Sequence, residues 1–188
     1  MSRVPIIMED KAPAEVKEIY DRIQKNGARI INLYRTLASN PRILCDFVRL
    51  GSSLLAKTEL SLKLRELAIL RVARLTESEY EWVQHYPIAL ETGIRPEQAE
   101  TISHWKSSKN FSDIERAVLQ YTDEVAQNAR VKDETFKVLQ QYLNSQNIVE
   151  LTVAIGYWGM VARFLEALHV DIDSHTISSA KELFGGKS

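Results

Sequence analysis

Three side chains in one short stretch of this sequence could carry out acid–base chemistry: Glu66, Glu81 and His85. Ser78, Glu81 and His85 follow one another at intervals of three and four residues, which places them on one face of a helix. Glu66 precedes them on another helix, where nearly all its same-face neighbours are apolar. A carboxylate desolvated in this way tends to a raised pKa, and a histidine near a carboxylate tends to stay charged. Such groups can donate and accept protons near neutral pH.

These residues also have purely structural interpretations. A glutamate on a mostly apolar helix is often a buried salt-bridge partner, here for Arg71 or for His85 itself. A glutamate and a histidine four residues apart are often only a pair on a helix surface. Perturbed titratable groups occur in structural networks as well as in active sites, so the residues alone leave both interpretations open.

Two helices must position this cluster. The first is expected over about residues 61–75, with Glu66 on or beside its buried face. The second is expected to begin near Glu77 and to end at Gly93, because glycine is a common residue directly after a helix. The positions expected to face solvent on the first helix are Lys63, Arg65 and Arg74.

The rest of the chain is also expected to be helical, which makes the fold all-α. Helical periodicity and start signals mark further helices over about residues 14–25, 30–37, 41–56, 96–105, 113–129, 133–143 and 145–168. The last of them is apolar almost all round and should be central. We predict a single all-helical domain over residues 1–188, with an extended lead-in over 1–13, a short helix after Asp173 and a mobile tail at about 185–188.

A weak internal repeat is visible in the two apolar hairpins. A shift of 84 residues along the chain places Glu66 on Glu150 and His85 on His169. The same shift places Ala162 and Leu165 where the first copy has Ser78 and Glu81. If the two halves are copies, the second is mainly structural, and the polar cluster of the first is the site.

Composition excludes several classes of protein. With 188 residues, 45% hydrophobic residues and 26% charged residues, the chain can bury a real core. A net charge of −1 gives no electrostatic footprint for nucleic acid. The longest uncharged stretch of the C-terminal region, residues 151–162, is too short to span a bilayer, and the N-terminus has no apolar core of signal-peptide length. Neither nucleic acid nor membrane is an expected partner, and a cytoplasmic location is expected.

The cysteine content limits the chemistry further. Cys45 is the single cysteine, so a disulfide within the chain and a Cys-x-x-Cys redox pair are both excluded. Its apolar neighbours suggest a buried and inert thiol. The other histidines, His104, His169 and His175, are most simply surface or core residues.

Three segments resemble the carboxymuconolactone decarboxylase family, which shares its fold with alkylhydroperoxidase D (AhpD). They are residues 66–73, residues 78–85 and residues 156–165. In the peroxidase branch a glutamate is followed by two cysteines separated by two residues, and then by a histidine four residues later. That spacing falls here on Glu66, Ser78, Glu81 and His85, so both cysteines are missing and thiol peroxidase (peroxiredoxin) activity is not expected.

The cysteine-free pattern resembles the decarboxylase-type branch. The resemblance implies a small AhpD-like helical subunit in homotrimers or homohexamers, without a cofactor, that acts as a carbon–carbon lyase on a small carboxylated lactone or cyclic acid. His85 is then the candidate acid–base residue, oriented by Glu81 or Glu66, and Arg71 could hold a carboxylate. The remaining candidate substrate-binding residues are Ser78, Tyr80, Trp82, Tyr157 and Trp158. Such aromatic residues on apolar helices are more often simply core.

Other functions stay open at this stage. The chain could be a family member that carries a peroxidase label but lacks the cysteine pair, or a non-catalytic oligomeric protein that binds a small molecule. A buried Glu–His pair with a raised His pKa favours the enzyme, whereas a solvent-exposed or salt-bridged pair with no cavity favours the binding protein. Two carboxylates and a histidine could bind a divalent metal, but no complete ligand set is visible in the sequence, so no metal is expected.

Overall fold

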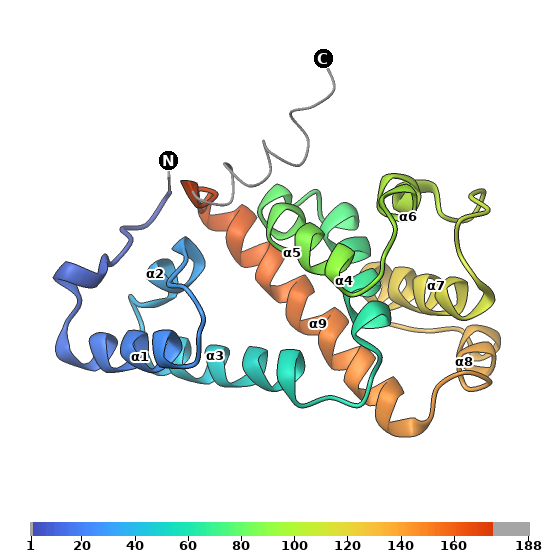
Figure 1. The fold of residues 1–188 in the computed structure, drawn as a ribbon, viewed down its shortest axis with the longest axis horizontal. Coiled ribbons are helices and arrows are strands. Elements are labelled where there is room, and N and C mark those ends of the chain that lie inside the picture. The colour runs from blue at the N-terminus through green and yellow to red at the C-terminus, as the bar shows by residue number, and fades with distance from the viewer. Residues whose placement is uncertain (1, 175–188) are drawn as a thin grey trace, which may run out of the picture. The chain divides into compact units, whose positions relative to one another are not determined.

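The structure, a computed structural model, describes residues 2–174 and is all-helical over that range, with no strand. The all-α prediction is therefore confirmed (Figure 1). The chain divides into two compact units, one made of residues 57–164 and the other of residues 1–56 together with the segment from residue 165 onward. The single domain over residues 1–188 stays a prediction.

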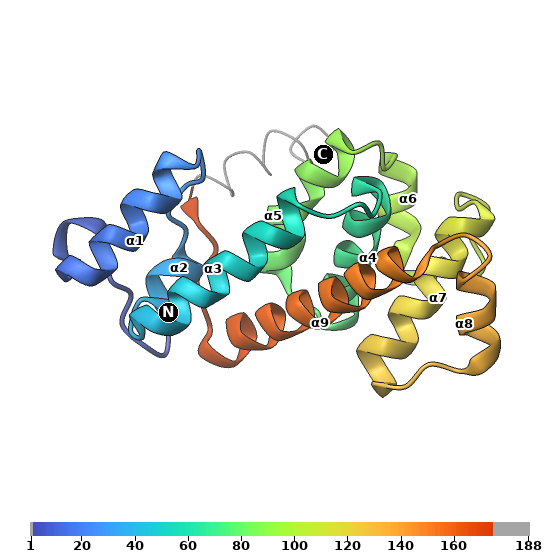
Figure 2. The same cartoon turned by 90° about the horizontal axis from the view of Figure 1, so that it is seen from below.

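Residues 57–164 form the unit that carries the predicted site. Its helices are α4 (Leu62–Leu75), α5 (Glu79–Glu91), α6 (Pro96–Thr101), the 3-10 turn η2 (Ile102–His104), α7 (Asp113–Asn128), α8 (Asp133–Leu139) and most of α9 (Ser145–Leu168). Helix α4 packs against both α5 and α7. Figure 2 shows these helices from a second direction. Apolar side chains from α4, α5, α6, η2 and α7 pack together into one core, which includes Leu67, Leu70 and Trp105.

The other unit contains the N-terminal helices. They are η1 (Glu9–Lys11), α1 (Ala14–Lys25), α2 (Asn32–Leu37) and α3 (Pro41–Ala56), and α3 contacts both α1 and α2. The backbone N–H of Asn32 donates to Asp173 at 2.9 Å, which ties α2 to the segment after α9. Cys45 on α3 is half-buried beside Arg22, so the prediction of a buried thiol is wrong.

Helix α4 is buried along almost its whole length. Ten consecutive residues from Leu64 to Ala73 are buried, and Glu66 has no exposed surface, as the sequence predicted. Arg65 is only 4% exposed, so the prediction that it faces solvent is wrong. The helical period predicts one solvated stripe, but α4 packs on more than one side and leaves Arg65 no water to reach. Arg74, nearer the end of the helix, is exposed as predicted.

Helix α9 is the most apolar element of the chain. Its 24 residues are long and apolar enough to cross a membrane by length and composition, which the shorter uncharged stretch did not suggest. However, 56% of its most apolar window is buried inside the protein, which is what a core helix also shows. Its outer side keeps a stripe of exposed apolar residues at helical spacing, namely Val149, Val153 and Met160.

The connection between α4 and α5 is only three residues long. Glu77 adopts the left-handed backbone conformation with φ 53°, so α5 begins at Glu79, two residues later than expected, with Ser78 as its N-cap. The tight reversal sets Glu66 and His85 opposite each other although 19 residues separate them. Most of the helix expected after Asp173, and the whole expected tail, lie outside the described residues, and the internal repeat stays a prediction.

Candidate active site

Glu66 is the centre of a fully buried charge cluster. Its Oε2 lies 2.8 Å from Nδ1 of His85, and its Oε1 accepts hydrogen bonds from Nε and Nη2 of Arg65 at 3.1 and 2.9 Å. Burial opposes a charge on Glu66, but the bonds from His85 and Arg65 outweigh it and hold the pKa of Glu66 below its ordinary value. The predicted pairing of Glu66 with His85 is confirmed, and the alternative pairing with Arg71 is not formed.

His85 has a partner on each ring nitrogen. The indole Nε1–H of Trp158 donates to Nε2 of His85 at 2.8 Å, and the two rings meet edge to face at 89°. Because an indole N–H can only donate, Nε2 must offer a lone pair. The ring proton therefore lies on Nδ1 and points at Glu66, so this arrangement holds His85 as the neutral Nδ1–H tautomer.

The pKa of His85 results from opposing influences. Burial disfavours the imidazolium, while the hydrogen bond to Glu66 and the negative charges of Glu66 and Glu81 raise the pKa of His85 above 6.5. To take a proton, Nε2 must exchange Trp158 for an acceptor. Oε2 of Glu81, 3.7 Å away, is a carboxylate oxygen placed to be that acceptor.

Glu81 is buried without a hydrogen-bond partner for its Oε2. It is 3% exposed, and burial, aided by the charge of Glu66, raises the pKa of Glu81 from 4.5 to about 7 although His85 acts against this. A carboxyl group with this pKa is present in both protonation states near neutral pH. Glu81 is therefore suited to exchange a proton with Nε2 of His85 or with a ligand.

Ser78 is the second buried group with an unused oxygen. Its hydroxyl makes no capping bond to α5 and has no partner, although the residue is only 1% exposed. Among the described residues, Ser78 Oγ and Glu81 Oε2 are the only buried side-chain oxygen or nitrogen atoms left without a hydrogen bond. Ser78 also lines a cavity of about 350 Å³ together with Ala73, Arg74, Glu77, Glu79 and Trp82.

The four aromatic candidates occupy different surroundings. Trp82 lines the cavity beside Ser78, and Trp158 bonds His85. Tyr80 and Tyr157 are buried, and Tyr157 packs on Trp158 with ring centroids 5.0 Å apart. Substrate contact by these residues stays a prediction. The hydrogen bond of Trp158 was not foreseen, because nothing in the sequence links two residues 73 positions apart.

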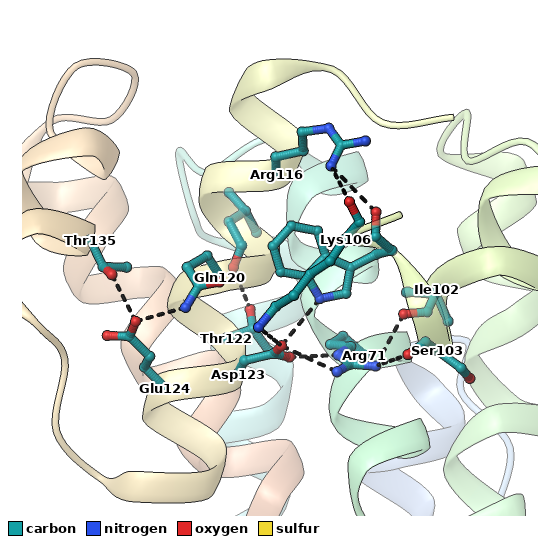
Figure 3. A network of polar contacts seen from close by, with 12 residues as sticks. Arg71, Ile102, Ser103, Lys106, Arg116, Gln120, Thr122, Asp123, Glu124 and Thr135 are labelled. Atoms are coloured by element: carbon teal, nitrogen blue, oxygen red, sulfur yellow. Dashed lines mark hydrogen bonds and ion pairs between the residues drawn. The ribbon is translucent and has the colours of Figure 1, made fainter. Parts of the chain in front are cut away.

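Arg71 belongs to a separate cluster, drawn in Figure 3. Its Nε and Nη2 donate to the two carboxylate oxygens of Asp123 at 2.6 and 3.2 Å, and its Nη1 donates to the carbonyl oxygens of Ile102 and Ser103. Nε1 of Trp105 completes the cluster with a bond to Asp123 at 3.1 Å. All three nitrogens of the Arg71 guanidinium are therefore engaged within the protein, and the carboxylate anchor suggested by the sequence stays a prediction.

The described residues offer no complete set of metal ligands at this site. Among residues 2–174 no group of three or more His, Cys, Asp or Glu side chains is arranged to hold an ion. Both nitrogens of His85 and both oxygens of Glu66 already have partners within the protein. His104 and His169 are exposed, as surface residues would be.

A comparison with protein families finds a match to part of the chain. Residues 41–124, which include α4, α5 and both buried charge clusters except Trp158, match the model of the carboxymuconolactone decarboxylase family. The chain resembles this family over that range. No curated protein matches the chain. The family match confirms the resemblance inferred from residues 66–85.

Solved structures show that the chain has the AhpD-like fold. An AhpD-core, peroxidase-related protein from Ralstonia eutropha superimposes with a TM-score of 0.80 at 17% identity, covering 93% of this chain and 94% of its own. A peroxidase-related protein from a Silicibacter species gives 0.78 at 18% identity, covering 93% of each chain. A cysteine-to-alanine variant of the debrominase Bmp8, in complex with 2,3,4-tribromopyrrole, gives 0.78 at 18% identity, covering 97% of this chain and 100% of its own.

The two buried oxygens without a hydrogen bond, Oγ of Ser78 and Oε2 of Glu81, belong to two residues of the peroxidase spacing pattern. In the peroxidase pattern described above, the places of Ser78 and Glu81 are held by cysteines. Here these positions carry a hydroxyl and a carboxyl group, and Ser78 Oγ and Glu81 Oε2 form no hydrogen bond with the described residues. The family match and these two groups support an enzymatic or related role for the chain.

Proposed function

We propose that this protein is a cofactor-free, thiol-independent acid–base enzyme of the decarboxylase type. Its substrate is a small carboxylated lactone or a related cyclic acid. The observation that carries the proposal is the carboxyl group of Glu81, which is buried, lacks a hydrogen bond at Oε2, and lies 3.7 Å from Nε2 of His85. A structural ion pair would satisfy that oxygen, whereas a proton-transfer group needs it free.

Decarboxylation of such a substrate requires one proton transfer. The bond between the ring carbon and the carboxylate breaks, carbon dioxide leaves, and the electron pair delocalises toward the lactone carbonyl. A proton must then be added to the carbon skeleton. The protonated carboxyl group of Glu81 is the donor in this proposal, and His85 exchanges protons with Glu81 through Nε2 once Trp158 has released that nitrogen.

Glu66 and Arg65 position His85. Glu66 fixes the proton of His85 on Nδ1, and Arg65 keeps Glu66 ionised, so the tautomer that presents Nε2 is maintained. This arrangement supports Glu66 as the orienting carboxylate and Glu81 as the second acid. The sequence left those two roles interchangeable.

A thiol mechanism is not part of the proposal. Peroxide reduction needs a nucleophilic thiolate and a resolving thiol, and Ser78 and Glu81 supply neither. Cys45, the single cysteine, lies on α3 in the other compact unit. We therefore propose that this chain is not a thiol peroxidase, although two of the similar structures are described as peroxidase-related proteins.

Self-association and a cytoplasmic location complete the proposal. The apolar stripe of Val149, Val153 and Met160 on α9 is 40% or more exposed at each residue, and it supports association into a homotrimer or homohexamer. A single cysteine without a disulfide partner in the chain suits a reducing compartment. Neither nucleic acid nor membrane is included among the proposed partners.

The deciding experiment is turnover of carboxymuconolactone by the purified protein, followed as carbon dioxide release. The wild type is compared with His85→Ala and Glu81→Gln, and with Glu91→Gln, which removes an exposed carboxylate at the end of the same helix. We expect turnover by the wild type and Glu91→Gln, and a loss of about a hundredfold or more in the other two. Equal turnover in Glu81→Gln and the wild type would exclude Glu81 as proton donor.

A further inference from the structure

We propose that the cavity beside Ser78 is a carboxylate-binding subsite, in which Arg74 and the N-terminus of α5 hold the acid group of a small cyclic ligand. The inference rests on the proposed function and deepens it, because it identifies the anchor that a carboxylated substrate needs. The cavity of about 350 Å³ is large enough for a five- or six-membered ring with its substituents.

Arg74 is the cationic side chain of this cavity. Its guanidinium carbon lies 3.4 Å from the centroid of the Trp82 ring, which it covers, and no described residue forms an ion pair with it. Stacking on an indole fixes the plane of the guanidinium and leaves its N–H groups available for a planar, bidentate partner. Partial burial lowers the pKa of Arg74 below its ordinary value. A carboxylate would compensate this charge.

Ser78 supplies the independent second observation. It is the N-cap of α5, a helix of 13 residues, yet its buried hydroxyl caps no backbone N–H and has no other partner. The N-terminus of a helix carries partial positive charge and unpaired N–H groups, both of which favour an anion. A buried hydroxyl without a bond costs free energy that a ligand in this cavity can recover.

The rim of the cavity limits the charge of the ligand. Glu77 and Glu79 line it with exposed carboxylates, so a second negative charge on the ligand would be repelled. The site therefore suits one carboxylate attached to an otherwise uncharged ring. Trp82 offers an apolar, aromatic surface beside it.

The position of the subsite fits the proposed reaction. Ser78 and Glu81 are three residues apart on α5, so they share a helix face and lie about 5 Å apart along its axis. A ring whose carboxylate meets Arg74 and Ser78 would be one helical turn from the carboxyl group of Glu81. In this proposal the arginine that binds the substrate carboxylate is Arg74, one turn further along α4 than Arg71, which the sequence suggested for that role.

The test uses furoate, a five-membered ring with one carboxylate, and furamide, its neutral isostere. Each is titrated into the full-length protein by isothermal calorimetry at neutral pH, with wild type, Arg74→Gln and Ser78→Ala. Arg49→Gln on α3 is the matched control, because Arg49 is an exposed arginine remote in sequence from this site. Arg74 is exposed and Ser78→Ala removes only an unbonded hydroxyl, so both variants should fold.

We expect the wild type and Arg49→Gln to bind furoate about tenfold or more tightly than furamide. Arg74→Gln should lose that preference, and Ser78→Ala should weaken furoate binding several-fold. Furoate binding that is absent at millimolar concentration, that equals furamide binding, or that is unchanged in Arg74→Gln overturns the proposal.

The proposed function and this subsite fail in different ways. Furoate binding that depends on Arg74, together with no lactone turnover, removes the reaction and leaves the subsite. Lactone turnover that is unaffected in Arg74→Gln removes the subsite and leaves the reaction. His85→Ala should abolish turnover while furoate still binds, since His85 does not line the cavity.

Discussion

Helix α4 carries two buried ionic clusters that contain the same kinds of groups but end in different states. At Asp123, two bonds from Arg71 and one from the indole of Trp105 satisfy both carboxylate oxygens. At His85, the indole of Trp158 donates to the imidazole, and the oxygen Oε2 of Glu81 nearby receives no hydrogen bond. In a cluster that only stabilises the fold, every buried polar atom is expected to be hydrogen-bonded, as at Asp123. In the His85 cluster one carboxylate oxygen, Oε2 of Glu81, has no hydrogen bond and is available for proton transfer.

The largest effect should come from breaking the saturated cluster. Arg71→Met leaves the buried carboxylate of Asp123 with only the exposed ammonium of Lys106, 3.9 Å away, as a cation. We expect a loss of about 3–5 kcal/mol in the free energy of unfolding. Urea denaturation measures it. The double variant Arg71→Met/Asp123→Leu should recover most of the loss, because it removes both charges together. A loss below about 1 kcal/mol in the single variant would show that this cluster is not a structural ion pair.

The raised pKa of Glu81 should make the free energy of unfolding depend on pH. The pKa of Glu81 is about 7 in the folded protein and near 4.5 when unfolded, so between these values the folded state binds more protons. Stability due to this group is therefore highest below about pH 4.5, falls as the pH rises to about 7, and is constant above. The fall amounts to about 3 kcal/mol.

Glu81→Gln isolates this contribution, because its side chain cannot ionise. We expect the wild type, but not this variant, to lose about 3 kcal/mol between about pH 5 and about pH 8 after the titration common to both has been subtracted. Glu91→Gln should follow the wild type. Parallel curves for wild type and Glu81→Gln would mean that Glu81 is not desolvated.

Trp158 and Trp105 each donate one hydrogen bond, to His85 and to Asp123, and their replacement should have smaller effects on stability. Trp158→Phe removes the donor to Nε2, so we expect a loss of about 1–2 kcal/mol in stability and a further rise in the pKa of His85. NMR titration of the His85 ring measures the second effect. Trp105→Phe should also reduce stability but leave that titration unchanged, since Trp105 bonds Asp123. An unaltered His85 titration in Trp158→Phe would contradict the assigned tautomer.

The smallest effect is expected at Ser78. Its hydroxyl is buried and unbonded, so Ser78→Ala should be neutral or stabilising by up to about 1 kcal/mol. Thr122→Val is the matched control, because the buried hydroxyl of Thr122 donates to the carbonyl of Val118 at 2.7 Å. That variant should lose about 1 kcal/mol. Destabilisation of Ser78→Ala to the same extent would show that Ser78 has a bond within the protein.

Local patterns were sufficient to predict most of the helices. The expected starts at residues 41 and 113 are those of α3 and α7: α3 begins at Pro41, and α7 follows the capping box of Ser112 and Glu115. Arg65 was misplaced because its burial depends on which helices surround α4. The late start of α5 depends on the left-handed conformation of Glu77, which a glutamate seldom adopts.

The site was predictable only where it is local. The spacing of Ser78, Glu81 and His85 is fixed by one helix, and the apolar neighbours of Glu66 indicated its burial. Contacts between distant segments could not be predicted. Asp123 is 52 residues from Arg71 and Trp158 is 73 from His85, and single-helix periodicity carries no information on such pairs. The same holds for the two arginines of α4, because Arg71 pairs with Asp123 while Arg74 forms no ion pair with a described residue.

Because Trp158 is hydrogen-bonded to His85, the intrinsic fluorescence of Trp158 should report on the state of this histidine. The three tryptophans contact three different ionic groups: Trp82 lies under the guanidinium of Arg74, Trp105 bonds the carboxylate of Asp123, and Trp158 bonds the imidazole of His85. Indole emission responds to the charge beside it. Variants that keep one tryptophan at a time would therefore separate ligand capture, structural integrity and proton exchange into three fluorescence signals, without any added label.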